Sequence, residues 1–214
     1  MIDTVFFDLG GVLLSKGWDR EFRREAAIEF QLDAGFEARH EKLAKVFECG
    51  QLSLDDYLGR VVFNQAREFT KTQFVDFIHH KQTPMADSLA VLKELRKTVV
   101  GGHHLLLCTL NNESRELNEY RIERFGLRDH FRAFFSSCYL GHMKPDAPIY
   151  RSALDIAQRH PGECLFIDDT AANLDAAQSL GMDTIHFQDA AQLRAELHRR
   201  GLISSAPTGG DTSS

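Results

Sequence analysis

Polar side chains that suit phosphoryl chemistry stand at or after the ends of four apolar runs of the sequence. Asp8 ends the first run, Thr109 to Asn112 end the second, Lys144 follows the third, and Asp168-Asp169 end the fourth. An Asp carboxylate can bind a metal ion or attack phosphorus to form an aspartyl-phosphate. Lysine, hydroxyl and amide groups are suited to binding phosphoryl oxygens. These residues therefore indicate a site for a phosphorylated ligand.

The acids of this set also predict a metal ion. Asp8, Asp168 and Asp169 would repel one another strongly in one place unless a cation joined them. Neither His nor Cys accompanies them, which argues against zinc. Oxygen-only ligation is what Mg²⁺ favours, so we expect Mg²⁺ as the cofactor.

The elements that must position these residues alternate along the chain. Apolar runs predict strands at 5–7, 104–110, 133–137, 164–167 and 183–187, and amphipathic patterns predict helices at 88–96, 113–125, 148–160, 170–180 and 190–199. Such alternation is typical of an α/β fold, a doubly wound Rossmann-like parallel sheet. The carboxyl ends of parallel strands meet at one edge, so the polar residues can converge there.

One segment interrupts the alternation. From Ser15 to about residue 84 the pattern is helical, with an amphipathic helix over 18–30, a capped helix start at Ser53 and a third helix over 72–78. We expect an α/β core of residues 1–14 and 85–203, a helical insert of residues 15–84 over the strand ends, and a disordered polar tail of residues 204–214.

Composition excludes several classes of protein. The formal net charge of -6 among 214 residues argues against a nucleic-acid or membrane-surface binder, because those need basic fields. No apolar stretch approaches membrane-spanning length, and the N-terminus carries no signal-like pattern. The four cysteines are widely spaced and suggest reduced core thiols. These features predict a cytoplasmic protein whose partner is a small molecule.

The motifs resemble, in order, those of the haloacid dehalogenase (HAD) superfamily, from Val5 to about His198. They are the Asp8 strand, Thr109 or Asn111 after the second strand, Lys144 in Gly-His-Met-Lys-Pro-Asp, and Asp168-Asp169 in Ile-Asp-Asp-Thr-Ala-Ala-Asn. The resemblance implies a Rossmann-like core, a small helical (C1) cap formed by the insert, and Mg²⁺-dependent hydrolysis of a small phosphorylated metabolite, with sugar phosphates among the common substrates.

The resemblance also implies roles. Asp8 would be the nucleophile and Lys144 would neutralise the phosphoryl oxygens. Asp168 and Asp169 would hold Mg²⁺ with Asp8. The segment Thr109-Leu110-Asn111-Asn112 would bind phosphate, and its register stays open: the strand count favours Thr109, whereas the following residues fit Asn111 and Asn112 better.

Gly10 departs from the family pattern. Most phosphatases of the superfamily carry an acid/base Asp two positions after the nucleophile, where this chain has Gly10. The Gly10 carbonyl can still ligate Mg²⁺. A general acid is worth roughly 10²–10⁴-fold in rate, so we expect either an acid from elsewhere, with Asp19 and His142 as candidates, or substrates with good leaving groups. We favour good leaving groups with weak borrowed acid help.

Two other functions remain as alternatives. In a haloacid dehalogenase Asp8 would attack carbon, a reaction that needs no metal, so Asp168-Asp169 count against it. In a catalytically silent HAD-like binding protein the site would only bind, which Gly10 favours and the retained Asp8 and Lys144 disfavour. The sequence does not address oligomeric state or the identity of the substrate.

Overall fold

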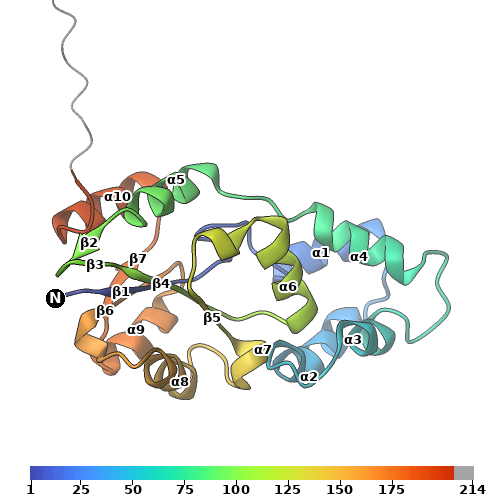
Figure 1. Ribbon diagram of the computed structural model, residues 1–214. Helices are drawn as coiled ribbons and strands as arrows, with labels where there is room; N and C mark the ends of the chain where they lie inside the picture. The colour runs from blue at the N-terminus through green and yellow to red at the C-terminus, as the bar shows by residue number, and fades with distance from the viewer. Residues whose placement is uncertain (205–214) are drawn as a thin grey trace, which may run out of the picture.

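The core of the protein is a parallel five-stranded sheet. The computed structural model describes residues 1–204, and the expected disordered tail from 205 onward lies outside them. The strands run in the order β5-β4-β1-β6-β7 and comprise β1 (Thr4–Phe7), β4 (Leu106–Asn111), β5 (Ala133–Ser136), β6 (Cys164–Asp168) and β7 (Asp183–His186). Figure 1 shows them side by side, with β1 in the middle. The expected α/β fold is confirmed.

The sheet order places a topological switch beside β1. Successive strands step outward through β4 to β5, and the chain then returns to the other side of β1 to form β6 and β7. The register pairs Phe7 with both Thr109 and Ile167, so Asp8 emerges between the ends of β4 and β6. In open α/β sheets this is the position where ligands bind.

Helices cover both faces of the sheet because successive strand side chains point to opposite faces. Val5 and Phe7 pack with α5, α6 and α10, whereas Phe6 packs with α8 and α9. The bounds are α5 (Ala86–Leu95), α6 (Arg115–Arg124), α8 (Ala147–Ala157), α9 (Ala171–Ser179) and α10 (Ala190–Arg199), with short 3-10 turns η1 (Leu127–Asp129) and η2 (Pro161–Glu163).

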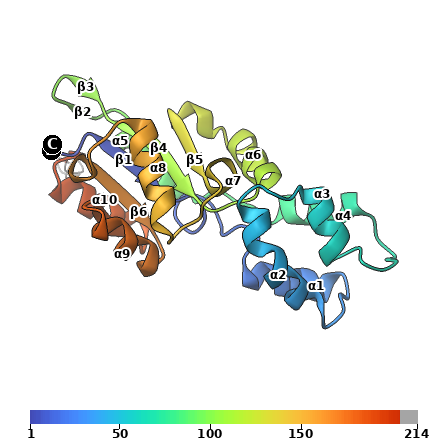
Figure 2. The same cartoon turned by 90° about the horizontal axis from the view of Figure 1, so that it is seen from below.

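The segment expected to form the helical insert, residues 15–84, has a hydrophobic cluster of its own. It contains α1 (Arg20–Glu29), α2 (Phe36–Glu48), α3 (Leu54–Val61) and α4 (Lys71–His80). Aromatic side chains such as Trp18, Phe22 and Phe74 pack together there, and Leu117 of α6 joins them from the core. Figures 1 and 2 show these four helices grouped at one end of the molecule, beyond the strand ends.

Besides the two 3-10 turns, four elements were not anticipated from the sequence. They are α2, the four-residue helix α7 (Ser137–Leu140), and a hairpin of β2 (Val99–Val100) and β3 (His103–His104). The hairpin turns at Gly101-Gly102, where both residues have positive φ, a conformation that glycine adopts without strain. All four cysteines are free and buried, as expected. Among the described residues, no helix has the length and apolar character needed to span a membrane.

Candidate active site

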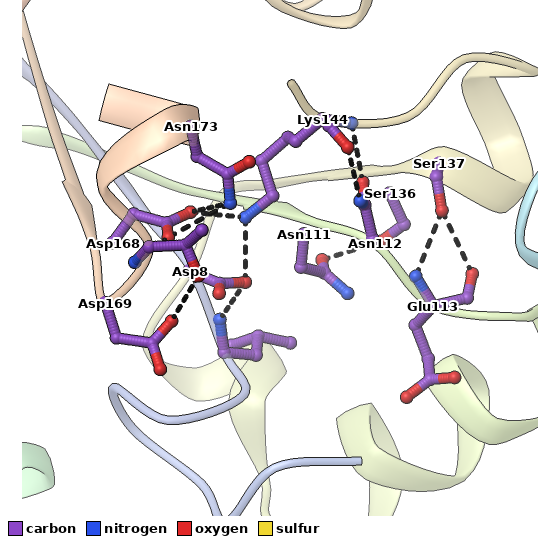
Figure 3. Close-up of polar contacts among 12 residues, drawn as sticks. Asp8, Asn111, Asn112, Glu113, Ser136, Ser137, Lys144, Asp168, Asp169 and Asn173 are labelled. Carbon is purple, nitrogen blue, oxygen red and sulfur yellow. Dashed lines mark hydrogen bonds and ion pairs between the residues drawn. The ribbon is translucent and has the colours of Figure 1, made fainter. Parts of the chain in front are cut away.

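Asp8 follows the last residue of β1 and is largely buried. Its backbone N–H donates to the Ile167 carbonyl at 2.9 Å, which continues the ladder with β6. Its Oδ1 accepts from the Leu9 N–H at 2.8 Å and lies 3.1 Å from the Lys144 Nζ. Both contacts use Oδ1, so Oδ2 of Asp8 has no hydrogen-bond partner among the described residues (Figure 3).

Lys144 reaches the same place from a loop that Asn112 fixes. The Asn112 side chain accepts from the Lys144 N–H at 2.8 Å and donates to the Lys144 carbonyl at 2.9 Å. The ammonium lies 2.6 Å from Oδ2 of Asp168, and Lys144 is 3% exposed. A buried ammonium between two carboxylates remains charged, and these carboxylates raise the pKa of Lys144 against the opposing effect of burial.

Asp168 and Asp169 extend the charged set from β6. Asn173 of α9 donates to both oxygens of Asp168, at 3.1 and 3.0 Å, and the Thr170 N–H donates to Oδ1 at 2.8 Å. Asp169 lies nearer the solvent, where its Oδ2 is 3.1 Å from the Nζ of Lys16. Asp168 is thus rigidly held, while Asp169 has a partner that is itself largely exposed.

The acids form a set that fits a divalent cation. Asp8, Asp168 and Asp169 each offer one oxygen, and these oxygens lie within 4.8 Å of one another. Burial raises the pKa of Asp8 to about 6, Lys144 acts in the opposite direction, and Asp168 adds to the rise. A cation among the three would offset this cost of burying like charges. All three donors are oxygens, which suits Mg²⁺.

The residues of the second motif, Thr109 to Asn112, differ in whether they reach the cavity at Asp8. Thr109 and Leu110 are fully buried within β4, and the Thr109 hydroxyl has no hydrogen-bond partner in the described part of the chain. Asn111 donates to Asn118 of α6 at 3.0 Å and accepts from Ser136 at 2.9 Å, so both ends of its amide are engaged inside the protein. Only Asn112, beyond the strand, lines the cavity at Asp8. Of the candidates Thr109, Leu110, Asn111 and Asn112, the residue that lines the cavity is therefore Asn112, which had been proposed together with Asn111.

A cavity of about 210 Å³ lies over these residues, and residues of the helical insert form one of its walls. The core side is lined by Asp8, Gly10, Asn112, Glu113, Arg121, Lys144, Asp169, Thr170 and Asn173, and the insert side by Lys16, Gly17, Trp18, Asp19, Phe47 and Glu48. Of the two acids suggested from the sequence to replace the missing Asp, Asp19 lines the cavity and His142 does not. Asp19 Oδ1 accepts from the Phe22 N–H at 2.8 Å and so caps α1.

A buried ion pair lies beside Gly10. Arg121 of α6 is 2% exposed, and its guanidinium contacts Glu113 Oε2 at 3.2 Å and the Ser15 carbonyl at 2.6 Å. A Cβ on Gly10 would lie 3.7 Å from both terminal nitrogens of Arg121. The side-chain position where family members carry an acid therefore faces a guanidinium in this chain.

Sequence reasoning missed Glu48, Glu113 and Arg121. Glu113 and Arg121 stand eight positions apart, so no local pattern pairs them. Glu48 reaches the cavity only because α2 packs on α7, and α2 itself was not anticipated. The one available signal was Glu113 directly after the motif residue Asn112. Asn173, the last residue of the Ile-Asp-Asp-Thr-Ala-Ala-Asn motif, donates to Asp168.

Comparison with known proteins places this geometry in a family. The chain matches the family described as haloacid dehalogenase-like hydrolase over residues 2–181. It is 27% identical to a D-ribitol-5-phosphate phosphatase of Bacteroides thetaiotaomicron, over 92% of this chain and 97% of that protein. It is also 27% identical to a sesquiterpene phosphatase of Aspergillus oryzae, over 92% and 95%.

A further relative matches only in part. Over 73 residues the chain is 38% identical to the rat bifunctional epoxide hydrolase 2, a match that covers 34% of this chain and 13% of that protein. Among solved structures, a HAD family enzyme from Bacteroides thetaiotaomicron, in complex with magnesium and inorganic phosphate, superposes with a TM-score of 0.73. It is 22% identical and the match covers 90% of this chain and 99% of that one. The family match over residues 2–181 and the shared fold agree with the four strand-end motifs: this chain belongs to the haloacid dehalogenase-like hydrolases.

Proposed function

We propose that the protein is a Mg²⁺-dependent phosphatase of small phosphorylated metabolites that works through an aspartyl-phosphate on Asp8. The observation that carries this proposal is the convergence of Asp8, Asp168 and Asp169 on Lys144, beside a cavity that Asp8, Asp169 and Lys144 line. The acids can bind a divalent cation, and the buried ammonium can neutralise the oxygens of a phosphoryl group. The two phosphatase relatives that align over more than nine-tenths of this chain support the same reaction class.

Mg²⁺ would be held by Asp8, Asp168 and Asp169, with the carbonyl of Gly10, a residue that lines the same cavity, as a further ligand. When bound, the ion supplies positive charge that orients the phosphoryl group and neutralises its oxygens. Asp168 is already fixed by Asn173 and Thr170, so it needs little rearrangement to act as a ligand.

The residues of the chain would divide the reaction between them. Oδ2 of Asp8, which has no partner among the described residues, attacks phosphorus while the ester oxygen leaves. Lys144 neutralises phosphoryl charge, and the Asn112 side chain fixes the Lys144 backbone at the cavity wall. Water then attacks the phosphorus of the aspartyl-phosphate, which frees Asp8 and inorganic phosphate.

The cavity restricts the substrate. Its volume of about 210 Å³ is below the roughly 300 Å³ at which pockets for drug-sized ligands begin. A phosphoryl group with a small alcohol fits this volume, and a longer substrate must extend out of it. The D-ribitol-5-phosphate phosphatase relative makes sugar and polyol phosphates the first compounds to try.

The test is phosphate release from a panel of sugar, polyol and aryl phosphates, with and without Mg²⁺. We expect Mg²⁺-dependent release that Asp8→Asn and Asp169→Asn abolish. Asp175→Asn, an exposed Asp on α9, is the matched control and should keep full activity. Release of halide from a 2-haloacid without Mg²⁺ would instead assign a dehalogenase. Mg²⁺-independent binding of phosphate esters without turnover would indicate a silent binding protein.

A further inference from the structure

A residue of the helical insert is placed to replace the acid that this chain lacks at position 10. Glu48 is the last residue of α2, and it lines the same cavity as Asp8, Gly10 and Lys144. It approaches from the insert side, opposite the sheet edge that carries Asp8. A proton donor for a leaving oxygen must face the nucleophile across the substrate, so this side of the cavity is the appropriate one.

Contacts with the core fix the position of Glu48. Ser137 Oγ donates to the Glu48 carbonyl at 2.7 Å, and the same Ser137 Oγ accepts from the Glu113 N–H at 3.0 Å. Two residues further on, Gly50 has φ +71°, and a Cβ there would lie 2.2 Å from the Cys138 carbonyl oxygen. The end of α2 is therefore seated directly on α7. Figure 1 shows the two helices adjacent.

The Glu48 carboxyl is the one acid of the cavity without a polar partner in the described chain. Asp8 contacts Lys144, Asp19 caps α1, Glu113 pairs with Arg121, and Asp169 pairs with Lys16. The other carboxyls are thus committed to a cation or a backbone N–H. Glu48 can exchange a proton without breaking an existing contact.

The surroundings of Glu48 also favour its protonated form. Burial raises the pKa of Glu48 to about 7, the Glu113 carboxylate adds to the rise, and Arg23 acts against it. A general acid works best with a pKa near the working pH. The other charged groups that face the cavity are Asp8, Lys16, Asp19, Glu113, Arg121, Lys144 and Asp169.

We propose that Glu48 is the general acid and base of the reaction, in place of the acid absent at Gly10; this rests on the proposed phosphatase function. As Asp8 forms its bond to phosphorus, the Glu48 proton moves to the leaving ester oxygen and the alcohol departs. The Glu48 carboxylate then takes a proton from the water that attacks the aspartyl-phosphate. Asp8, inorganic phosphate and protonated Glu48 result. With this acid, alkyl phosphates become substrates as well as esters with good leaving groups.

The experiment compares Glu48→Gln with the parent on ribitol 5-phosphate and on p-nitrophenyl phosphate, with Mg²⁺. The value of kcat/KM reports formation of the aspartyl-phosphate. We expect it to fall by about 10²–10⁴-fold for the alkyl ester, which needs a proton at the leaving oxygen, and to stay nearly constant for the aryl ester. In the variant, p-nitrophenol should appear in a burst followed by slow turnover, because the base for the second step is also lost.

Two further measurements separate catalysis from structure. Alkyl kcat/KM of the parent should decline above about pH 7, as Glu48 loses its proton, and Glu48→Gln should remove that decline. Glu41→Gln, an exposed acid on the same helix, is the control and should match the parent. Equal loss on both esters, or no loss on either, overturns the role of Glu48 while the phosphatase stands. A parent without turnover of any phosphate ester overturns the proposed function itself.

Discussion

The ammonium of Lys144 lies 2.6 Å from Oδ2 of Asp168, and both side chains are almost entirely buried. Asp8 lies on the other side of that ammonium, at 3.1 Å. One cation thus joins the ends of β1 and β6, which carry the acids of the site. These two contacts therefore also contribute to the free energy of unfolding of the protein.

Lys144→Met should therefore destabilise the protein when no metal is present. It leaves Asp8 and Asp168 buried without their cation, a change that typically costs about 3–5 kcal/mol. Urea unfolding without Mg²⁺ measures the loss, and Mg²⁺ should restore more stability to the variant than to the parent. Lys45→Met, which removes an exposed pair with Asp146, should cost about 1 kcal/mol or less. Equal losses in the two variants would contradict this account.

Gly11→Ala should weaken Mg²⁺ binding. Gly11 has φ +81°, and a Cβ there would lie 2.4 Å from Oδ2 of Asp169, so Asp169 must move from its place beside Asp8. Titration calorimetry of Mg²⁺ with the variant and the parent measures the change. Gly59→Ala is the control, since a Cβ on Gly59 meets only the Lys71 Nζ at 3.9 Å. Unchanged affinity in Gly11→Ala would exclude Asp169 from the metal site.

Gly10→Asp should fit the structure and yet fail to supply an efficient acid. A Cβ at Gly10 makes only ordinary contacts, with the Arg121 nitrogens at 3.7 Å. The new carboxyl would pair with this guanidinium, and a nearby opposite charge holds an Asp pKa low. We expect the gain in kcat/KM on alkyl phosphates to stay well below the roughly 10²–10⁴-fold of an effective general acid. A gain of that size would show that Arg121 leaves the acid free to act.

His40 should make the helical insert less stable in acid. The Trp18 indole N–H donates to the Tyr57 oxygen at 2.7 Å, and His40 Nδ1, at 2.8 Å, is the one acceptor within the described residues for the Tyr57 hydroxyl proton. An unprotonated Nδ1 accepts this proton, and burial together with Arg23 lowers the pKa of His40 to about 4 from 6.5.

Because the folded-state pKa of His40 is depressed, its stability contribution is complete above about pH 7 and lost as the pH falls through 6.5 toward 4. The shift corresponds to about 3 kcal/mol. Urea unfolding at pH 7.5 and pH 5, followed by Trp18 fluorescence, should show about 2 kcal/mol of this, because pH 5 still lies above the folded-state pKa. His40→Asn keeps an acceptor for Tyr57 and should lose part of the pH dependence. An identical pH dependence in variant and parent would contradict the assignment.

The core fold follows from sequence because its strands are apolar on both faces and end at polar residues. Runs such as 164–167 are distinct from the amphipathic helices around them, and this alternation is enough to predict a parallel sheet. Parallel strands bring Asp8 and Asp168 to one edge whatever the details of packing. The convergence of these two acids therefore needed no knowledge of side-chain contacts.

The contribution of the helical insert could not be predicted in the same way. Which residue of α2 meets the cavity depends on how α2 packs on α7, and this packing is set by Gly50 against Cys138 and by Ser137. Strand parity places Thr109 and Asn111 on one side of β4. It does not reveal that the Asn111 amide donates a hydrogen bond to Asn118 of α6. Tertiary contacts, which no local sequence pattern contains, determine that Asn112 and Glu48 line the cavity.

The most direct test of the central claim is to trap the intermediate on Asp8. The protein is mixed with Mg²⁺ and p-nitrophenyl phosphate, quenched in acid within milliseconds, and digested for peptide mass spectrometry. Glu48→Gln should accumulate more of the phosphorylated species than the parent, because breakdown of the aspartyl-phosphate is slowed. We predict phosphate on the peptide that contains Asp8 and its absence in Asp8→Asn. Turnover that proceeds equally well in Asp8→Asn, with no phosphorylated peptide, would contradict the claim.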